Sequence, residues 1–418
     1  MTTEGPANAA IRHRYIVAPN HVPTEGNSAM RTIRRGLCAL LVVASAIAST
    51  GCRDTTAAPI QPPADRAVLR QAMVDMVRAG AVGVQLRVHD DSGDWTASAG
   101  VSELGKPEPP STDGRFRIGS ITKTFVSTVI LQLVAEGRLG LDDPADEHLP
   151  GYGIDRRITV RMLLQHTSGL FDYTGDHNSD GGFEAGIPLQ GAEYVDAKMR
   201  GYTLGELARL ALSKPARFAP GERWQYSNTN YVLAGLLIEK LTGTPYATQI
   251  RTRLLIPLGM SDTSLPGAEP TVAGPHAHGY LEYQRDGRTE LADITELNPS
   301  WAGSAGEIIS TTADLDRFLA ALLGGRLLTP QLLQVMGTPF PVPDRPGGFG
   351  LGLVDRRVGP DCDVYGHTGG IHGYLSQLYG SKDGARRVAM SITLNQDPDS
   401  QAGAFIPAVM SILGTLCR

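Results

Sequence analysis

A serine and a lysine three residues apart, Ser120 and Lys123, are the side chains of this 418-residue chain best suited to chemistry. Residues i and i+3 of a helix share a face, so the hydroxyl and the amine can meet where a helix begins. A serine hydroxyl is a poor nucleophile at neutral pH and needs a base within hydrogen-bond reach, and a partly desolvated lysine can serve. Taken alone, the pair favours a plainer interpretation, a serine that starts a helix.

Two further motifs follow Ser120. Tyr226-Ser227-Asn228 is the sole Y-x-N sequence in the chain and precedes an apolar helical pattern, and His367-Thr368-Gly369 ends a predicted strand. Each motif alone favours a structural role, as a helix cap or as a buried histidine. Together, the order S-x-x-K, Y-x-N, H-T-G is that of serine β-lactamases and penicillin-binding peptidases, which this chain therefore resembles.

The resemblance covers about residues 65–418 and is strongest toward the secreted D-alanyl-D-alanine carboxypeptidases of the class C β-lactamase-like group. It implies an α/β (α+β) fold in which an antiparallel sheet, built from both termini, is flanked by helices and carries an inserted, mostly helical subdomain. The stretches that carry it are G-S-I-T-K-T-F (119–125), L-L-Q-H-T-S-G-L (163–170), Y-S-N-T-N-Y (226–231), S-W-A (300–302), S-A-G (304–306) and the placement of Cys362 and Cys417.

Apolar periodicity agrees with this division of the chain. Strand patterns occur near both ends, and the middle is rich in short helical patterns, so we expect a sheet part at about 65–118 and 300–418 and a helical subdomain at about 119–299. The predicted helices are 65–79, 123–136 and a C-terminal tail, and the predicted strands are 82–88, a segment near Trp95, 349–353, 364–367, 375–379 and 388–394.

The predicted catalytic residues are Ser120, Lys123, Tyr226 and His367. Ser120 at a helix start lies where main-chain N–H groups and the positive end of the helix favour an oxyanion. Either Lys123 or Tyr226 can take its proton, and the sequence leaves open which one does. His367 stands where related enzymes commonly have a lysine.

The predicted substrate-binding residues are Asn228, Thr368, Gly370, Trp301 and Arg356. Asn228 offers an amide to a substrate carbonyl or to the lysine, and Thr368 offers a hydroxyl. By resemblance, the N–H of Gly370 is the second oxyanion donor and Trp301 lines the site. No metal site is expected, because His276-Ala277-His278 is not followed by a ligand at the spacing of metallo-hydrolases.

Recognition of a substrate carboxylate is where the chain departs from the carboxypeptidases. In those enzymes an arginine follows the G-L-G-L segment and a threonine follows H-T-G, whereas this chain has Val354 and Gly370. Arg356 lies two residues beyond Val354, so on a strand it faces the same side and is predicted to reach the same carboxylate.

These features predict an exported serine hydrolase that acts through an acyl-serine intermediate, with a D-alanyl-D-alanine carboxypeptidase on cell-wall peptides as the first expectation. An esterase, amidase or β-lactamase of the same family is the alternative, and a non-catalytic penicillin-binding sensor is a third. The expected partners are peptidoglycan stem peptides, β-lactams or similar small molecules, without a cofactor. A net charge of −5 with scattered basic residues argues against nucleic acid, and we expect a monomer.

The N-terminal part predicts targeting rather than fold. Residues 30–52 form a leader with arginines before a short apolar run, so residues 1–29 are interpreted as a misannotated extension, and 53–64 as a Pro-rich linker. The leader ends in a lipobox-like S-T-G-C, so Cys52 is a possible lipidation site of a cell-surface lipoprotein. Ala46-Ile47-Ala48 instead fits signal peptidase and a secreted protein.

Cysteine usage agrees with export. Cys38 leaves with the leader, and if Cys52 carries lipid, Cys362 and Cys417 remain as an even pair in an oxidising compartment. We predict that these two form a disulfide, with two separate buried thiols as the alternative.

Overall fold

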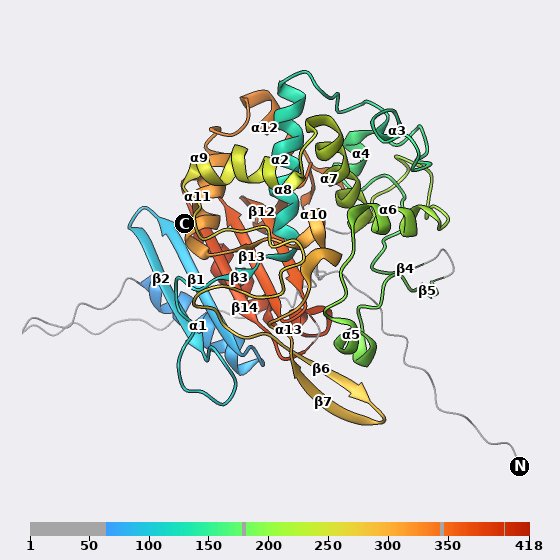
Figure 1. Cartoon of the computed structure of the whole chain (residues 1–418). Helices are drawn as coiled ribbons and strands as arrows, with labels where there is room; N and C mark the ends of the chain where they lie inside the picture. Colours follow the sequence, from blue (N-terminus) through green and yellow to red (C-terminus); the bar gives the residue numbers. More distant parts are fainter. Residues whose placement is uncertain (1–63, 178–180, 343–346, 397) are drawn as a thin grey trace, which may run out of the picture.

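The computed structural model describes residues 64–177, 181–342, 347–396 and 398–418 (Figure 1). The predicted extension 1–29, the leader 30–52 with Cys52, and the linker 53–64, apart from its last residue, lie outside these residues. Among the helices that the structure describes, none is both long enough and apolar enough to cross a bilayer.

An antiparallel sheet of eight strands, in the order β2-β1-β14-β13-β12-β11-β10-β9, forms the centre of the molecule (Figure 1). β1 pairs with β14, with Gly83 opposite Thr393, so the two ends of the chain build one sheet. The predicted fold class is confirmed. The strands are β1 (Gly83–Asp90), β2 (Gly93–Gly100), β9 (Phe340–Pro341), β10 (Gly347–Phe349), β11 (Val354–Gly359), β12 (Cys362–Ile371), β13 (Tyr374–Gly380) and β14 (Arg387–Thr393).

Helices α1 (Ala64–Arg78) and α13 (Pro398–Leu413) cover one face of this sheet. Their apolar side chains form one buried cluster with alternate residues of the central strands, because successive side chains of a strand point to opposite faces. The cluster includes Leu69, Met73, Phe405, Ile412, Leu86, Val364, Leu375, Tyr379 and Met390.

The other face of the sheet packs against the helical part of the chain. Helix α2 (Thr122–Ala135) is apolar around most of its circumference and nearly all of it is buried, which identifies it as the central helix. Helices α7 (Asn228–Thr242), α10 (Gly303–Gly306) and α11 (Thr312–Leu323) pack around it in a second apolar cluster. This layer brings distant parts of the sequence to the start of α2.

Shorter elements complete the chain. The capping box of Thr203 and Glu206 fixes the start of α6. The remaining helices are α3 (Ala145–His148), α4 (Val160–Leu164), α5 (Gly191–Ala197), α6 (Leu204–Leu212), α8 (Tyr246–Ile250), α9 (Ile256–Leu258) and α12 (Pro330–Gly337), and the small two-stranded sheets pair β3 (Phe116–Arg117) with β8 (Ile309–Ser310), β4 (Asp176–His177) with β5 (Phe183–Glu184), and β6 (Tyr280–Arg285) with β7 (Arg288–Asp293).

The predicted strand at 349–353 is wrong. Residues 350–353 form a turn between β10 and β11, closed by a hydrogen bond from the N–H of Gly350 to the carbonyl of Leu353 at 2.8 Å. Gly352 has φ +74°, and a Cβ there would lie 2.2 Å from Oγ of Ser127 and 2.6 Å from the hydroxyl of Tyr231. Gly352 thus lets the turn pack closely on α2 and α7, where a side chain has no room.

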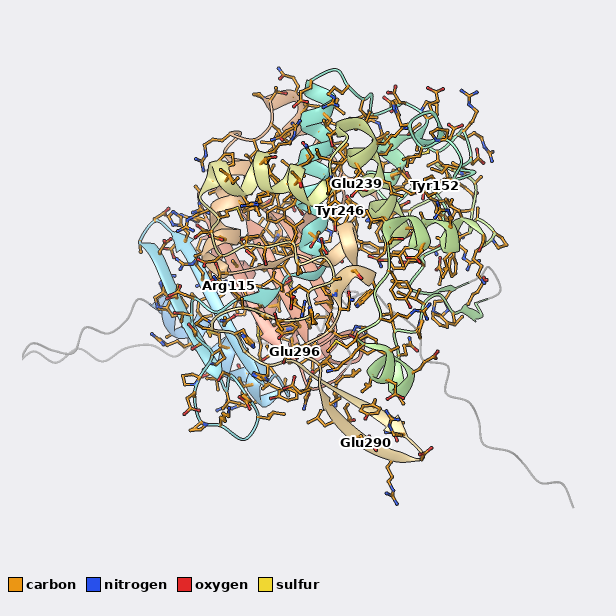
Figure 2. All side chains as sticks on the ribbon, viewed as in Figure 1. Arg115, Tyr152, Glu239, Tyr246, Glu290 and Glu296 are labelled. Carbon is orange, nitrogen blue, oxygen red and sulfur yellow. A yellow bond between two sulfur atoms is a disulfide. The ribbon has the colours of Figure 1, made fainter. Side chains whose placement is uncertain are left out.

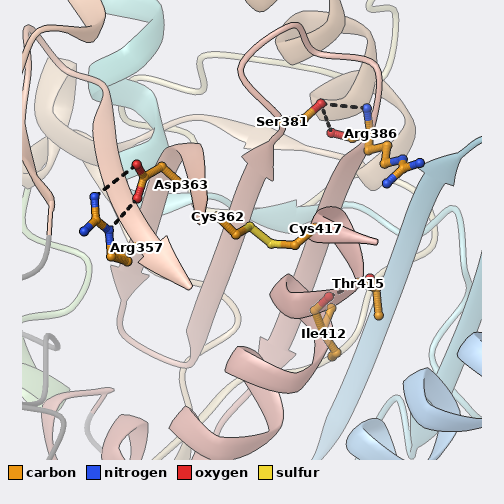
Figure 3. The surroundings of a disulfide bond; sticks show 8 residues. All are labelled: Arg357, Cys362, Asp363, Ser381, Arg386, Ile412, Thr415 and Cys417. Carbon is orange, nitrogen blue, oxygen red and sulfur yellow. Dashed lines mark hydrogen bonds and ion pairs between the residues drawn. A yellow bond between two sulfur atoms is a disulfide. The ribbon is translucent and has the colours of Figure 1, made fainter. Parts of the chain in front are cut away.

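Cys362 and Cys417 are joined in a disulfide with Cα atoms 5.7 Å apart, the pairing expected from the sequence (Figure 3). The bond ties the start of β12 to the 3-10 turn at Gly414–Cys417. Its loop spans 55 residues of sequence, so it restricts the unfolded chain substantially.

We predict that replacing both cysteines, Cys362→Ser with Cys417→Ser, lowers the free energy of unfolding by about 2 to 4 kcal/mol, measured by urea denaturation. Activity of the folded variant should persist, because Cys362 begins the strand whose far end carries the H-T-G motif. Thiol labelling of both Cys362 and Cys417 in the denatured, unreduced protein, read by mass spectrometry, would contradict the disulfide.

Candidate active site

Ser120 lies in a 3-10 turn, Gly119–Ile121, that leads directly into α2. Gly119 has φ +50°, and a Cβ there would lie 2.7 Å from the carbonyl oxygen and 2.8 Å from the nitrogen of Gly370 in β12. Glycine at 119 therefore lets the turn lie directly against the main chain of β12. The N–H groups of Ser120 and Gly370 belong to these two adjoining segments, as an oxyanion site requires.

The amine of Lys123 is held by groups from three parts of the fold. Nζ lies 3.0 Å from Oγ of Ser120, 2.8 Å from Oδ1 of Asn228 and 2.7 Å from the carbonyl oxygen of Ala305 in α10. The amide and carbonyl oxygens accept but cannot donate, so they take the two hydrogens of a neutral amine. The lone pair then faces the serine hydroxyl, which is the arrangement of a general base.

Burial shifts the pKa values of the two candidate bases, Lys123 and Tyr226, in opposite directions. It lowers the pKa of Lys123 to about 7, against an opposing effect of the Asp172 charge. It raises the pKa of Tyr226 well above 10, although the hydrogen bond to Ser120 acts in the other direction. Near neutral pH much of Lys123 is therefore a neutral amine, whereas Tyr226 is a protonated phenol whose hydroxyl donates to Oγ of Ser120 at 2.8 Å.

Asn228 is the first residue of α7, and its side chain joins the lysine to a buried carboxylate. Its Oδ1 accepts from Lys123, while its main-chain N–H and Nδ2 donate to Oδ2 of Asp172 at 2.9 and 3.1 Å. Asn228 therefore contacts the lysine rather than projecting freely toward a substrate.

His367 faces the helical side of the sheet and is almost completely buried. Its Nδ1–H donates to the carbonyl of Thr368 at 2.5 Å, and Nε2 has no hydrogen-bond partner among the described residues. Burial lowers the pKa of His367 to about 3, with a smaller contribution from the charges of Lys123 and Arg356. The imidazole is therefore neutral, and it supplies no positive charge of the kind that a lysine would bring.

Thr368 and Trp301 come from different elements. Thr368 follows His367 in β12, opposite Gln377, and is half-buried. Trp301 ends the 3-10 turn Pro299–Trp301 just before α10, and its ring centroid lies 5.5 Å from that of His372. Their contacts with a substrate stay predictions.

Two site residues were missed in the sequence, Asp172 and His166. The imidazole of His166 stacks on the ring of Tyr226, with centroids 4.2 Å apart and an interplanar angle of 27°. In the sequence, the stretch that contains His166 carries the resemblance but was given no chemistry. The one signal was the run of polar residues from Gln165 to Ser168 after two leucines, which places polar groups at the edge of a core.

A model of the family described as Beta-lactamase matches residues 66–410. The chain belongs to the beta-lactamase family. The family and the S-x-x-K geometry make it a hydrolase of the beta-lactamase and penicillin-binding protein type.

Three proteins with other activities in their names are similar to this chain. A D-stereospecific amidohydrolase from Streptomyces sp. has a similar structure, with 39% identity, a TM-score of 0.73, and coverage of 82% of this chain and 97% of that one. Penicillin-binding protein 4* of Bacillus subtilis is 29% identical over 67% of this chain, and esterase EstB of Burkholderia gladioli is 34% identical over 53%. The matches span 61% of the penicillin-binding protein and 56% of the esterase, less than two thirds of each.

Within this family fold, Arg356 lies on the sheet face away from Ser120. It is opposite Val364 in the β11–β12 register, and Val364 belongs to the cluster against α1 and α13. Its guanidinium carbon lies 5.2 Å from the ring centroid of Tyr379 in the same cluster. Val354 and Arg356 do share a face, but that face is covered by helices, so this placement does not support the predicted contact of Arg356 with a substrate carboxylate.

We therefore predict that Arg356→Ala lowers kcat/KM for carboxylate-ended and neutral substrates by the same factor. Stability should fall by about 0.5 to 2 kcal/mol, because the cation–π contact with Tyr379 is lost. Arg357→Ala is the matched control, since Arg357 is exposed and pairs with Asp363 at 2.9 Å (Figure 3). A loss confined to carboxylate-ended substrates would restore the role expected from the sequence.

A cavity of about 430 Å³ is lined by Gly303 and Glu307 at the two ends of α10. Its lining includes neither Ser120 nor Lys123. Tyr246, labelled in Figure 2, also lines this cavity and donates a hydrogen bond to the buried carboxylate of Glu307. The cavity is therefore not the cleft of the Ser120 site.

A second group of possible ligands lies at the sheet edge. His89, Asp94 and Asp316 bring donor atoms within 4.8 Å of one another. Both oxygens of Asp316 already accept from Arg387, at 2.8 and 3.0 Å, and Asp94 bonds to His89 at 2.6 Å. These contacts make an ion-pair cluster, and we assign no metal to it.

The buried imidazoles predict a loss of stability in acid. An unfolded histidine has a pKa near 6.5, whereas burial lowers the pKa of both His166 and His367 in the folded protein. Below about pH 6.5 the unfolded chain binds protons that the folded protein does not, so the free energy of unfolding decreases as pH falls toward 3. His367 should contribute up to about 1.4 kcal/mol per pH unit in this window.

Urea denaturation between pH 7 and pH 4 checks this with His367→Gln, which should lose less stability per pH unit than the wild type. His276→Gln, a half-buried loop position, is the control and should keep the wild-type slope. Equal slopes for the wild type and His367→Gln would show that His367 does not titrate as predicted.

Proposed function

We propose that this protein hydrolyses amides and esters of D-amino acids through an acyl-Ser120 intermediate, in preference to peptides that end in a free carboxylate. The acyl-serine chemistry rests on the contacts of Ser120 with Lys123 and Tyr226. The preference for neutral leaving groups rests on the charges around β12. The sequence had favoured a D-alanyl-D-alanine carboxypeptidase, and the structure shifts the balance to the alternative within the same family.

The preference for neutral substrates rests on one observation: the positively charged groups near β12 already have partners within the protein. Lys123 is buried among Ser120, Asn228 and Ala305, and Arg356 stacks on Tyr379 on the other face of the sheet. His367, at the position of the usual lysine, is neutral. A carboxylate entering beside β12 would lose its hydration without gaining a charged partner from these three side chains, which is unfavourable.

The reaction can be followed at each atom. The lone pair of Lys123 accepts the proton of Ser120 as Oγ bonds to the substrate carbonyl carbon, and the N–H groups of Ser120 and Gly370 bind the oxyanion. The bond from carbon to the leaving nitrogen or oxygen then breaks. Lys123 gives the proton it took from Ser120 to that atom, so the amine or alcohol leaves neutral and the lysine is again a free base, while the Tyr226 hydroxyl stays protonated as a hydrogen-bond donor next to Oγ. Water then attacks the acyl-Ser120 ester by the same steps, with Lys123 accepting the proton of the water, and the carboxylic acid product is released.

The comparisons support an amidase comparably with a peptidase. The protein named as a D-stereospecific amidohydrolase is 39% identical, and penicillin-binding protein 4* is 29% identical. The D-alanyl-D-alanine carboxypeptidase stays a second candidate, because the penicillin-binding protein match covers 67% of this chain.

We also propose that the protein is exported. The disulfide between Cys362 and Cys417 supports this, since disulfides persist in oxidising compartments and are rare in the cytosol. Lipidation of Cys52 is part of the same proposal and can be tested by mass spectrometry of the membrane fraction.

The substrate assay compares kcat/KM for D-phenylalanine amide, L-phenylalanine amide, D-phenylalanine methyl ester and an acyl-D-alanyl-D-alanine peptide. We predict that the D-amide and the D-ester exceed the peptide by at least about tenfold, the size expected from one missing charge-assisted hydrogen bond. The L-amide should be the slower enantiomer. Ser120→Ala should abolish turnover of every substrate.

Fast release of D-alanine from the peptide, with slow amide hydrolysis, would reverse the proposed preference and favour the carboxypeptidase. Labelling of the wild type by fluorescent penicillin, absent in Ser120→Ala, tests the acyl-serine step separately. A label without turnover of any of these substrates would favour the non-catalytic sensor.

A further inference from the structure

A loop that carries no catalytic motif, residues 166–174, contacts the Y-x-N segment along its length. Nδ1 of His166 accepts from the N–H of Ser227 at 3.3 Å, and Oγ1 of Thr229 donates to the carbonyl of Phe171 at 2.7 Å. Asp172 contacts Asn228 twice. We call residues 166–174 the 166–174 loop.

We propose that Asp172 is a positioning residue for the general base Lys123, acting through Asn228. The proposal rests on the acyl-serine function above and extends it, because none of the three motifs includes Asp172. It follows from the orientation of the Asn228 amide and from the negative charge of the buried Asp172 carboxylate.

Asp172 selects the orientation of the Asn228 amide. Its Oδ2 accepts from both the main-chain N–H and Nδ2 of Asn228, and a carboxylate oxygen can accept only from the amide nitrogen, not from Oδ1. Oδ1 is therefore turned to Nζ of Lys123, at 2.8 Å. With the amide reversed, Nδ2 would face the amine as a second donor and the hydrogen bond to the base would be lost.

Asp172 is placed to be ionised. It is 1% exposed, and its Oδ1 accepts from the N–H and the hydroxyl of Thr174 at 3.0 and 2.9 Å. Four donors therefore converge on its two oxygens, which suits a carboxylate rather than a protonated acid. Burial raises the pKa of Asp172, and the hydrogen bonds from Asn228 and Thr174 oppose this rise.

The charge of Asp172 acts on Lys123 across a single amide. The other titratable groups that influence or face the amine are Tyr226, Tyr231, His166 and His367. Burial raises the pKa of both tyrosines and lowers that of both histidines, so all four are neutral near neutral pH. Asp172 thus supplies the negative charge that opposes desolvation of the lysine.

Asp176 is a second carboxylate next to Asp172. It accepts from the N–H of Asp172 at 3.4 Å, and its charge adds to burial in raising the pKa of Asp172. Arg217 pairs with Asp176 at 3.3 Å and offsets part of that negative charge.

The test is the pH dependence of Ser120 acylation in Asp172→Asn, measured as kcat/KM for D-phenylalanine methyl ester, a substrate without a carboxylate. Without the negative charge, the pKa of Lys123 should fall, so the acid limb of the acylation rate should move to lower pH by about one unit. The plateau rate should fall at least about tenfold, because the Asn228 amide is no longer held. Asp172→Ser, which removes the charge but keeps a small acceptor for the N–H of Asn228, should show the same shift.

Asp314→Asn is the matched control. Asp314 is another fully buried carboxylate, whose Oδ2 accepts from the N–H of Asp262 at 3.0 Å and from the hydroxyl of Thr263 at 2.8 Å. Its replacement should lower the melting temperature while leaving the acid limb in place. This separates the loss of a buried carboxylate in general from the loss of the one beside Asn228.

The outcomes are distinct. A folded Asp172→Asn or Asp172→Ser with the wild-type acid limb overturns the proposal, as does failure of both variants to fold while Asp314→Asn folds, because the role is then structural. Absence of Ser120-dependent ester turnover in the wild type itself defeats the acyl-serine function instead. A shifted limb in a folded variant, beside an unshifted control, supports Asp172 as the positioning residue.

Discussion

The burial of the Lys123 amine is the constraint on which the catalytic site depends. A charged ammonium loses its hydration in this position, and burial alone drives the group toward the neutral form that a base requires. A buried amine must still donate hydrogen bonds, and Lys123 donates them to oxygens of α7 and α10. The position of the nucleophile follows, because the remaining direction of Nζ is toward Oγ of Ser120.

Because the buried amine needs hydrogen-bond acceptors, the site requires segments that lie far apart in the sequence. The acceptors of the lysine lie 105 and 182 residues away from it in the sequence, and the oxyanion strand lies further along. The sheet built from both ends holds β12 against the 3-10 turn of Ser120, while α2 runs through the helical layer. Each layer therefore supplies one side of the same site.

The sequence predicted the parts of the site that depend on residue type and order. Ser120, Lys123, Tyr226 and Asn228 come together because local motifs place each of them at the start of a helix or next to one. The fold class followed from strands at both ends, while the strand at 349–353 was wrong because close packing of a turn and a smooth strand face both favour alternating glycines. Asp172 was missed because its contacts lie 56 residues away, and an aspartate after two apolar residues carries no signal of its own.

Arg356 shows what the alternation of residues along a strand cannot predict. Alternation correctly placed it on the same face as Val354, but alternation does not say which face of a strand meets the nucleophile, because that depends on the layers packed against the sheet. With Arg356 on Tyr379 and a neutral imidazole at 367, the titrating cation next to Ser120 is the base itself. The negative charge of a substrate carboxylate near Ser120 would raise the pKa of Lys123 and so protonate the base, while the hydrogens of the buried amine stay on Asn228 and Ala305. The same burial that makes the lysine a base therefore disfavours an anionic substrate, and the chemistry of the site and its specificity have one physical origin.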